Sequence, residues 1–128
     1  MSSESSKNKP LIFSLSRNKR NNDILVKILG EQGYEVAGCT DPVGMVSDAK
    51  NREKVNLVIM DISGFNQNIW KSCEDLRLLD IPFLVLSPQQ HRVIEEQGMK
   101  QGAKRVLVKP LVIKELLYLV KSLVENSN

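Results

Sequence analysis

The chain has 128 residues, of which 41% are hydrophobic and 26% are charged, and its formal net charge is +3 at pH 7. This length suits one domain that buries roughly two thirds of its unfolded surface, and this composition is that of a globular protein. The small positive charge identifies no nucleic-acid partner. Cys39 and Cys73 share no ligand-like spacing and have no histidine nearby, so neither a zinc site nor a disulfide framework is supported.

No apolar stretch approaches the length of a membrane span. The N-terminal segment SSESSKNK also lacks the apolar core of a signal peptide. We therefore expect a cytoplasmic protein with reduced thiols and no membrane insertion. Residues 1–9 have almost nothing to bury and are predicted to be a flexible tail, followed by one domain over 10–125 and a short tail over 126–128.

From residue 10 onward, apolar runs of strand length alternate with segments of helical spacing. The predicted order is strand 11–15, helix 20–32, strand 34–39, a helix beginning after Asp41-Pro42, strand 55–60, helix 66–79, strand 83–87, helix 90–101, strand 105–108 and helix 111–125. Asp41 is expected to cap the second helix, with Pro42 in its first turn. Gly33 and Gly102 are expected to end the first and fourth helices.

The apolar stripes of the helices indicate which sides face the core. On the first helix this stripe consists of Ile24, Leu25, Ile28 and Leu29. Trp70 and Cys73 on the third helix are interpreted as core residues and not as part of a cofactor site. His91, beside Gln89, Gln90 and Arg92, is interpreted as a solvated histidine.

Regular alternation of helices with continuously apolar strands predicts an α/β fold with helices on both faces of a parallel sheet. We expect a doubly wound, flavodoxin-like sheet of five strands in the order 2-1-3-4-5, with five helices. In such sheets the ligand site lies beyond the carboxyl ends of the strands. Asp61, Ser87 and Lys109 each follow an apolar run, so they are predicted to meet there.

Three segments resemble the receiver domain of two-component response regulators, and this resemblance covers about residues 10–125. They are NLVIMD ending in Asp61, PFLVLS ending in Ser87, and GAKRVLVKP containing Lys109-Pro110, with GYEV at 33–36 at the expected distance after the first helix. The resemblance implies that Asp61 accepts a phosphoryl group, that Ser87 hydrogen-bonds the phosphate and that Lys109 binds its oxygens. It also implies a cis peptide bond before Pro110.

The chain departs from this family at the metal site. The family has an acidic pair after the first strand that holds Mg²⁺, but Ser16 and Arg17 occupy those positions here. Mg²⁺ is bound by carboxylates together with substrate phosphate, so we expect no cofactor and a magnesium affinity that is weak or lost. Asp61, Lys109 and Arg17 together carry a net positive charge, so the pocket can be balanced without a metal.

The orientation of Arg17 is open at the level of sequence. If it points inward, it could pair with Asp61 and supply the charge of the missing ion, since buried charges require pairing. The alternative is that it extends into water. Arg17, Lys19 and Arg20 at the start of the first helix form either a site for an anion or acidic partner or a solvated basic turn.

Two further departures concern signal output. Val106 stands where the family has an aromatic residue that rotates inward, so the usual rotamer switch is missing. Pro88 follows Ser87 where a small residue is usual, which fixes the backbone and removes an amide donor. The loop after Asp61 lacks the family's customary proline turn, although Gly64 provides flexibility.

These features predict an atypical, stand-alone receiver domain that is a protein-interaction module and not an enzyme, with no magnesium-dependent phosphorylation. The expected partner is a signalling protein, either a histidine kinase or a downstream effector. It would contact the fourth helix, fifth strand and fifth helix, or the first and last helices, and a homodimer is a further option. Nucleic acid is not expected as a partner, because no helix-turn-helix follows the domain.

Two other functions stay open. A working phosphoacceptor would use Asp61 with Ser87 and Lys109, whereas a flavodoxin-like binder would place a small ligand at the same edge of the sheet. Lys109 also has a purely structural interpretation, in which it forms an ion pair with Asp61.

Overall fold

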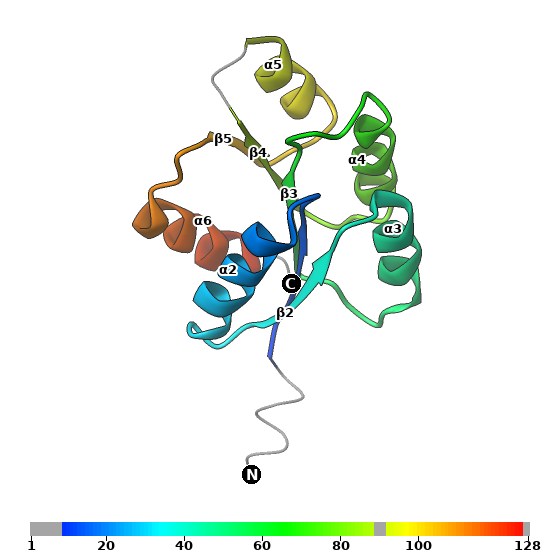
Figure 1. Cartoon of the computed structure of the whole chain (residues 1–128). Coiled ribbons are helices and arrows are strands. Elements are labelled where there is room, and N and C mark those ends of the chain that lie inside the picture. The colour runs from blue at the N-terminus through cyan, green and yellow to red at the C-terminus, as the bar shows by residue number, and fades with distance from the viewer. Residues whose placement is uncertain (1–8, 89–91, 127–128) are drawn as a thin grey trace.

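The computed structural model describes residues 9–88 and 92–126, which form alternating strands and helices around one sheet (Figure 1). In chain order the elements are β1 (Leu11–Leu15), α2 (Lys19–Gly30), β2 (Glu35–Cys39), α3 (Pro42–Asn51), β3 (Leu57–Asp61), α4 (Ile69–Leu78), β4 (Phe83–Ser87), α5 (Arg92–Lys100), β5 (Arg105–Val108) and α6 (Ile113–Glu125). The strand order is β2-β1-β3-β4-β5, and all neighbouring strands are parallel. The predicted fold class and strand order are confirmed.

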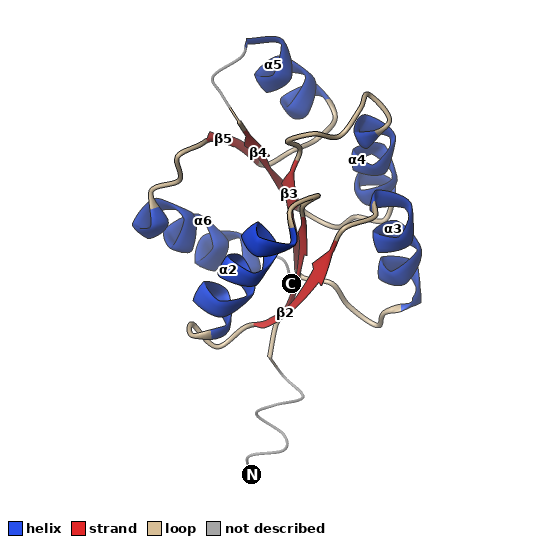
Figure 2. Cartoon of the chain, in the orientation of Figure 1, coloured by secondary structure: helices blue, strands red, loops and turns tan. Residues whose placement is uncertain are grey.

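Helices cover both faces of the sheet (Figure 2). α2 and α6 pack on one face against alternate residues of β1, β3 and β4, and α3, α4 and α5 pack on the other. Every residue of these three central strands is buried. A strand with both faces covered needs apolar side chains at every position, which explains the continuous apolar runs in the sequence. Within the described ranges, none of the helices combines the length and apolar character needed to cross a membrane.

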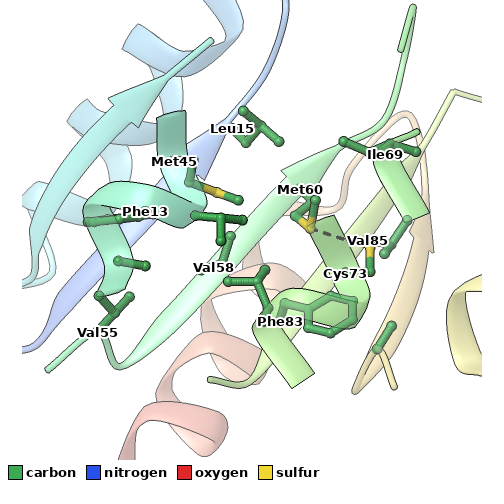
Figure 3. Close-up of a cluster of buried hydrophobic side chains, with 14 of the residues drawn as sticks. Phe13, Leu15, Met45, Val55, Val58, Met60, Ile69, Cys73, Phe83 and Val85 are labelled. Atoms are coloured by element: carbon green, nitrogen blue, oxygen red, sulfur yellow. Dashed lines mark hydrogen bonds between the residues drawn. The ribbon is translucent and has the colours of Figure 1, made fainter. Parts of the chain in front are cut away.

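The core cluster under α3 and α4 holds β3 in place (Figure 3). Met60, one residue before Asp61, lies beside Cys73 of α4, with 3.6 Å between the two sulfur atoms. Burial raises the pKa of the Cys73 thiol to about 12, so this thiol stays protonated and packs as an apolar group. Cys73 is therefore a core residue, and Trp70 packs beside the same cluster.

The local signals for helix ends were mostly correct. Asp41 accepts a hydrogen bond from the Gly44 N–H and caps α3, as predicted. Gly33 and Gly102 adopt positive φ angles of 96° and 101° after α2 and α5. α4 begins at Ile69 and not at residue 66, because the N–H groups of residues 69–71 bond to carbonyls three residues back, which is a tighter turn than an α-helix.

One predicted core residue is exposed, and several predicted segments lie outside the described residues. Ile24 was wrongly assigned to the buried stripe of the first helix, because its side chain is 48% exposed and Asn22 is buried instead. The predicted tails lie outside the described residues except for Lys9 and Asn126, and His91 with Gln89 and Gln90 lies outside them too.

Asn22, near the start of α2, links β1 to β2 through its side chain. Its side-chain amide donates to the Cys39 carbonyl of β2 at 2.7 Å, and its amide oxygen accepts a hydrogen bond from the Ser14 hydroxyl of β1 at 2.9 Å. The amide also lies 3.5 Å from the Ser16 carbonyl. Asn22 is only 3% exposed, so it fixes the connection that carries Ser16 and Arg17.

We predict that Asn22→Ala lowers the free energy of unfolding by about 1–3 kcal/mol, because it leaves the buried Ser14 hydroxyl without its acceptor and removes the side-chain hydrogen bond to the Cys39 carbonyl. Urea unfolding monitored by circular dichroism measures the change. Asn21→Ala is the matched control, because Asn21 is bonded to the Asn18 side chain through its backbone N–H. The control should change stability by less than about 0.5 kcal/mol, and equal losses in the two variants would contradict the role of Asn22.

Candidate functional site

Polar side chains gather where four neighbouring strands end. Asp61 and Ser87 are the last residues of β3 and β4, and Ser16 and Lys109 directly follow β1 and β5. The register pairs Asp61 with Leu86, one residue before Ser87, so the strand ends are level. The predicted cis peptide bond joins Lys109 to Pro110, and the Lys109 N–H donates to the Ser87 carbonyl at 2.9 Å. Parallel strands thus bring these residues to one edge, as the sequence predicted.

Both oxygens of the Asp61 carboxylate have partners. The Lys109 Nζ lies 2.5 Å from Oδ2, and the Ser16 hydroxyl lies 3.4 Å from the same oxygen. The backbone N–H of Ser63 donates to Oδ1 at 3.1 Å. Asp61 is 2% exposed, and a carboxylate this deeply buried requires a counter-charge and hydrogen bonds.

Lys109 supplies that counter-charge. Its side chain is 27% exposed, and its Nζ also lies 3.5 Å from the Ser63 hydroxyl. The ion pair is the structural interpretation that the sequence left open for Lys109. Ser87 is 1% exposed at the adjacent strand end, and the roles of Ser87 and Lys109 in contacting a phosphate stay predictions.

Arg17 adopts neither of the two orientations considered from the sequence. Its side chain is exposed but does not simply extend into water, because Nη1 donates to the Gly64 carbonyl at 2.7 Å. Among the ion pairs between described residues, Asp61 is paired with Lys109 and not with Arg17. Sequence reasoning missed Gly64 as the partner of Arg17, because this contact joins two loops that are 47 residues apart.

The donor set at this edge does not fit a magnesium ion. Mg²⁺ takes oxygen ligands in octahedral geometry and favours carboxylates, but among the described residues that line the pocket the one carboxylate is that of Asp61, which is already paired with Lys109. Over the described ranges, no three His, Cys, Asp or Glu side chains lie close enough to hold a metal. At the two positions where the resemblance implies an acidic pair, Ser16 supplies an uncharged hydroxyl and Arg17 supplies a cation.

A shallow apolar pocket opens beside the ion pair, between α2 and the connection from β5 to α6. Its lining comprises Asn21, Ile24, Leu25, Asp61, Leu86, Lys109, Pro110, Leu111 and Ile113. Ile24 and Ile113 on its rim are 48% and 40% exposed. The Asp61 and Lys109 pair therefore lies at the end of an apolar surface that two helices share.

Val106 is half-buried beneath α5, at the position where the resemblance implies a mobile aromatic side chain. A Cβ atom placed on Gly98 of α5 would lie only 2.8 Å from Cγ2 of Val106. Gly98 is also the buried residue of α5. The helix therefore approaches β5 closely because neither position carries a large side chain.

We predict that Gly98→Ala lowers the free energy of unfolding by about 1–3 kcal/mol through overpacking against Val106. This loss exceeds the roughly 0.5–1 kcal/mol that alanine gains over glycine within a helix. Gly30→Ala in α2 is the matched control, because no atom lies within 4 Å of its added Cβ. Urea unfolding should show a loss for Gly98→Ala, none for Gly30→Ala, and partial recovery in Gly98→Ala/Val106→Ala. Equal stability of the two single variants would contradict the close approach.

A double-mutant cycle tests the buried ion pair. Lys109→Met leaves a buried carboxylate without its cation, and we expect a loss near the lower end of the roughly 3–5 kcal/mol range for such pairs, since Lys109 is partly exposed. Asp61→Asn/Lys109→Met should lose less than the sum of the single variants, with a coupling of about 0.5–3 kcal/mol. The exposed pair Lys19 and Asp23, 3.5 Å apart, provides a control cycle with a coupling below about 1 kcal/mol. Additive losses at Asp61 and Lys109 would show that the pair contributes nothing.

The sequence of the chain is similar to that of one bacterial transcriptional regulatory protein. An uncharacterized transcriptional regulatory protein, YbdJ of Bacillus subtilis (strain 168), is 31% identical, and the match covers 81% of this chain but 46% of that protein. The chain thus spans less than half the length of this relative. No family model matches the chain.

Several solved structures match the fold of this chain over nearly its whole length. The receiver domain of the Francisella response regulator 1452 superposes with a TM-score of 0.81 at 20% identity, covering 94% of this chain and 100% of that one. The CheY-like receiver domain protein from Methanospirillum hungatei JF-1 gives 0.83 at 19% identity, covering 94% and 97%. A two-component response regulator from Clostridium difficile gives 0.83 at 17% identity, covering 94% and 99%. The resemblance noted in the sequence is confirmed for the fold: the chain has the fold of the response-regulator receiver domains.

Proposed function

We propose that this chain is an atypical receiver domain that acts as a protein-interaction module in signalling, without magnesium-dependent phosphorylation and without catalysis. The observation that carries the proposal is the direct ion pair between Asp61 and Lys109, at a place where no three His, Cys, Asp or Glu side chains of the described residues gather. A phosphoacceptor that depends on a metal needs the opposite arrangement, in which several carboxylates hold an exchangeable cation.

The contacts of Asp61 support a site that is closed to magnesium. An ion approaching Oδ2 would displace the Lys109 ammonium and would meet one carboxylate instead of three. The ammonium would then face a nearby divalent cation, which is unfavourable in a partly buried site. Magnesium affinity is therefore expected to be weak or lost, and the charge state of the pocket does not depend on the ion.

The apolar pocket between α2 and α6 supports docking by the first and last helices, one of the two surfaces that the sequence suggested. Ile24 and Ile113 stand on its rim, and Leu111 and Pro110 continue it toward Lys109. A partner that covers this surface with an apolar face reaches the ion pair at its inner end. We expect this partner to be a signalling protein, either a histidine kinase or a downstream effector.

A working phosphoacceptor is the second candidate, because Asp61, Ser87 and Lys109 do lie together at the strand ends. In that function the Lys109 ammonium would leave the carboxylate and bind phosphoryl oxygens. The two candidate functions differ in one requirement. A phosphoacceptor must admit a cation and a phosphoryl mimic to the pocket, whereas the interaction module need not.

We predict that amide-resolved NMR spectra of the chain do not change locally on addition of millimolar Mg²⁺, nor on further addition of beryllofluoride. The amides to follow are those of Ser63, Gly64, Ser87 and Lys109. The physical reason is that Lys109 already neutralises the carboxylate, so the ion gains little by entering. Sodium chloride at equal ionic strength is the control for general salt effects.

Asp61→Asn separates a specific response from an adventitious one. If the wild-type chain shows saturable shifts around Ser63 and Lys109 that Asp61→Asn abolishes, the phosphoacceptor function replaces the one proposed here. Stoichiometric acyl phosphorylation of Asp61 by a small phosphodonor with Mg²⁺ would lead to the same conclusion.

A further inference from the structure

Arg17 and Gly64 fit each other closely. The guanidinium Nη1 donates to the Gly64 carbonyl at 2.7 Å, and a Cβ atom on Gly64 would lie 3.3 Å from the Arg17 Cδ. Gly64 adopts a positive φ of 80°, which favours glycine. The arginine side chain therefore lies across the backbone of the loop that follows Asp61, and that loop presents its carbonyl to the arginine.

The loop on either side of Gly64 is tied to the functional site. The Ser63 N–H donates to the Asp61 carboxylate, and the Phe65 N–H donates to the Ile62 carbonyl at 3.1 Å. Ser63 also offers its hydroxyl to Lys109 at 3.5 Å. A shift of Gly64 would therefore disturb the backbone donor that orients the Asp61 carboxylate.

The loop that carries Arg17 is itself firmly held. The Ser16 N–H donates to the Cys39 carbonyl at 3.0 Å, and the Ser16 hydroxyl accepts from the Asn18 N–H at 3.1 Å. The buried Asn22 amide binds the same Cys39 carbonyl. Arg17 thus extends from a rigid support at the end of β1, and its contact with Gly64 transmits that rigidity to the loop after β3.

We propose that Arg17 is a positioning residue that takes the place of a divalent cation at this edge of the sheet. Its tethered guanidinium joins the loop after β1 to the loop after β3 through the Gly64 carbonyl, and it holds a positive charge there permanently. A metal ion that coordinated a loop oxygen would provide the same cross-link, but it would exchange with solvent. The inference rests on the proposed function only in that magnesium does not occupy the wild-type site.

Hydrogen exchange of the Ser63 and Phe65 amides, measured by NMR without any metal, tests the cross-link. Arg17→Ala should accelerate both by about tenfold, because local opening of the loop becomes easier. Arg20→Ala is the matched control, since it removes an exposed cation from the same turn, and it should leave both rates unchanged. Arg17→Lys should restore part of the protection. Arg17→Gln keeps a hydrogen-bond donor but removes the charge, so it shows which of the two is needed. Rates in Arg17→Ala equal to those of the wild type and of Arg20→Ala would overturn the proposal.

Acidic variants test the replacement of the ion. In Arg17→Asp and in Ser16→Asp/Arg17→Asp, millimolar Mg²⁺ should shift the Ser63 and Gly64 amides and restore their slow exchange. Arg20→Asp carries the same change in charge and should not respond. If the double variant fails to fold, the Arg17→Asp variant alone provides this test. Absence of any response to Mg²⁺ in that variant would overturn the proposal that Arg17 takes the place of a divalent cation.

The two proposals fail in different ways. Magnesium binding by the wild-type chain would remove the proposed function whatever Arg17 does. Unchanged exchange in Arg17→Ala would remove the role of Arg17 while a wild-type chain that ignores magnesium still supports the interaction module.

Discussion

The arrangement at the strand ends depends on the burial of one carboxylate. Asp61 is 2% exposed, and a buried carboxylate is stable only with a counter-charge and with hydrogen bonds to its oxygens. The sheet provides both, because the ends of β3 and β5 bring Lys109 within 2.5 Å of Oδ2 while the Ser63 N–H reaches Oδ1. The loop after β3 and the connection after β5 must therefore place Ser63 and Lys109 against this carboxylate.

The cation comes from the edge of the sheet, which makes the ion pair sensitive to packing far from it. β5 has a single neighbouring strand, β4, and its half-buried Val106 lies beneath Gly98 of α5. The close approach of Gly98 to Val106 sets the distance between that helix and the strand. A larger residue at either position would push α5 away from β5, and the backbone that leads into Lys109 would lose support on one side.

The fold followed from patterns that repeat along the sequence. Apolar runs identified β1, β3 and β4, and the residues at their ends predicted where Asp61 and Ser87 meet, because parallel strands end at a common edge. Arg17 could not be placed in this way, since a contact between two loops depends on backbone angles such as the positive φ at Gly64. Asn22 did leave a signal: it stands three and seven residues before Leu25 and Leu29, and so on the buried stripe, whereas Ile24 was placed there on apolar character alone.

A tethered cation and an exchangeable cation have different consequences for signalling. An ion stabilises the state that binds it by an amount that depends on its concentration, so a metal site couples the conformation of its loops to solution conditions. Lys109 and Arg17 are covalently part of the chain, so neither can dissociate from it as a metal ion can. A ligand shifts a conformational equilibrium only when it binds two states with different affinity. Under the proposed function and the proposed role of Arg17, a metal would have nearly the same affinity for every conformation of this pocket. The surface between α2 and α6 would then be presented to a partner in one constant form.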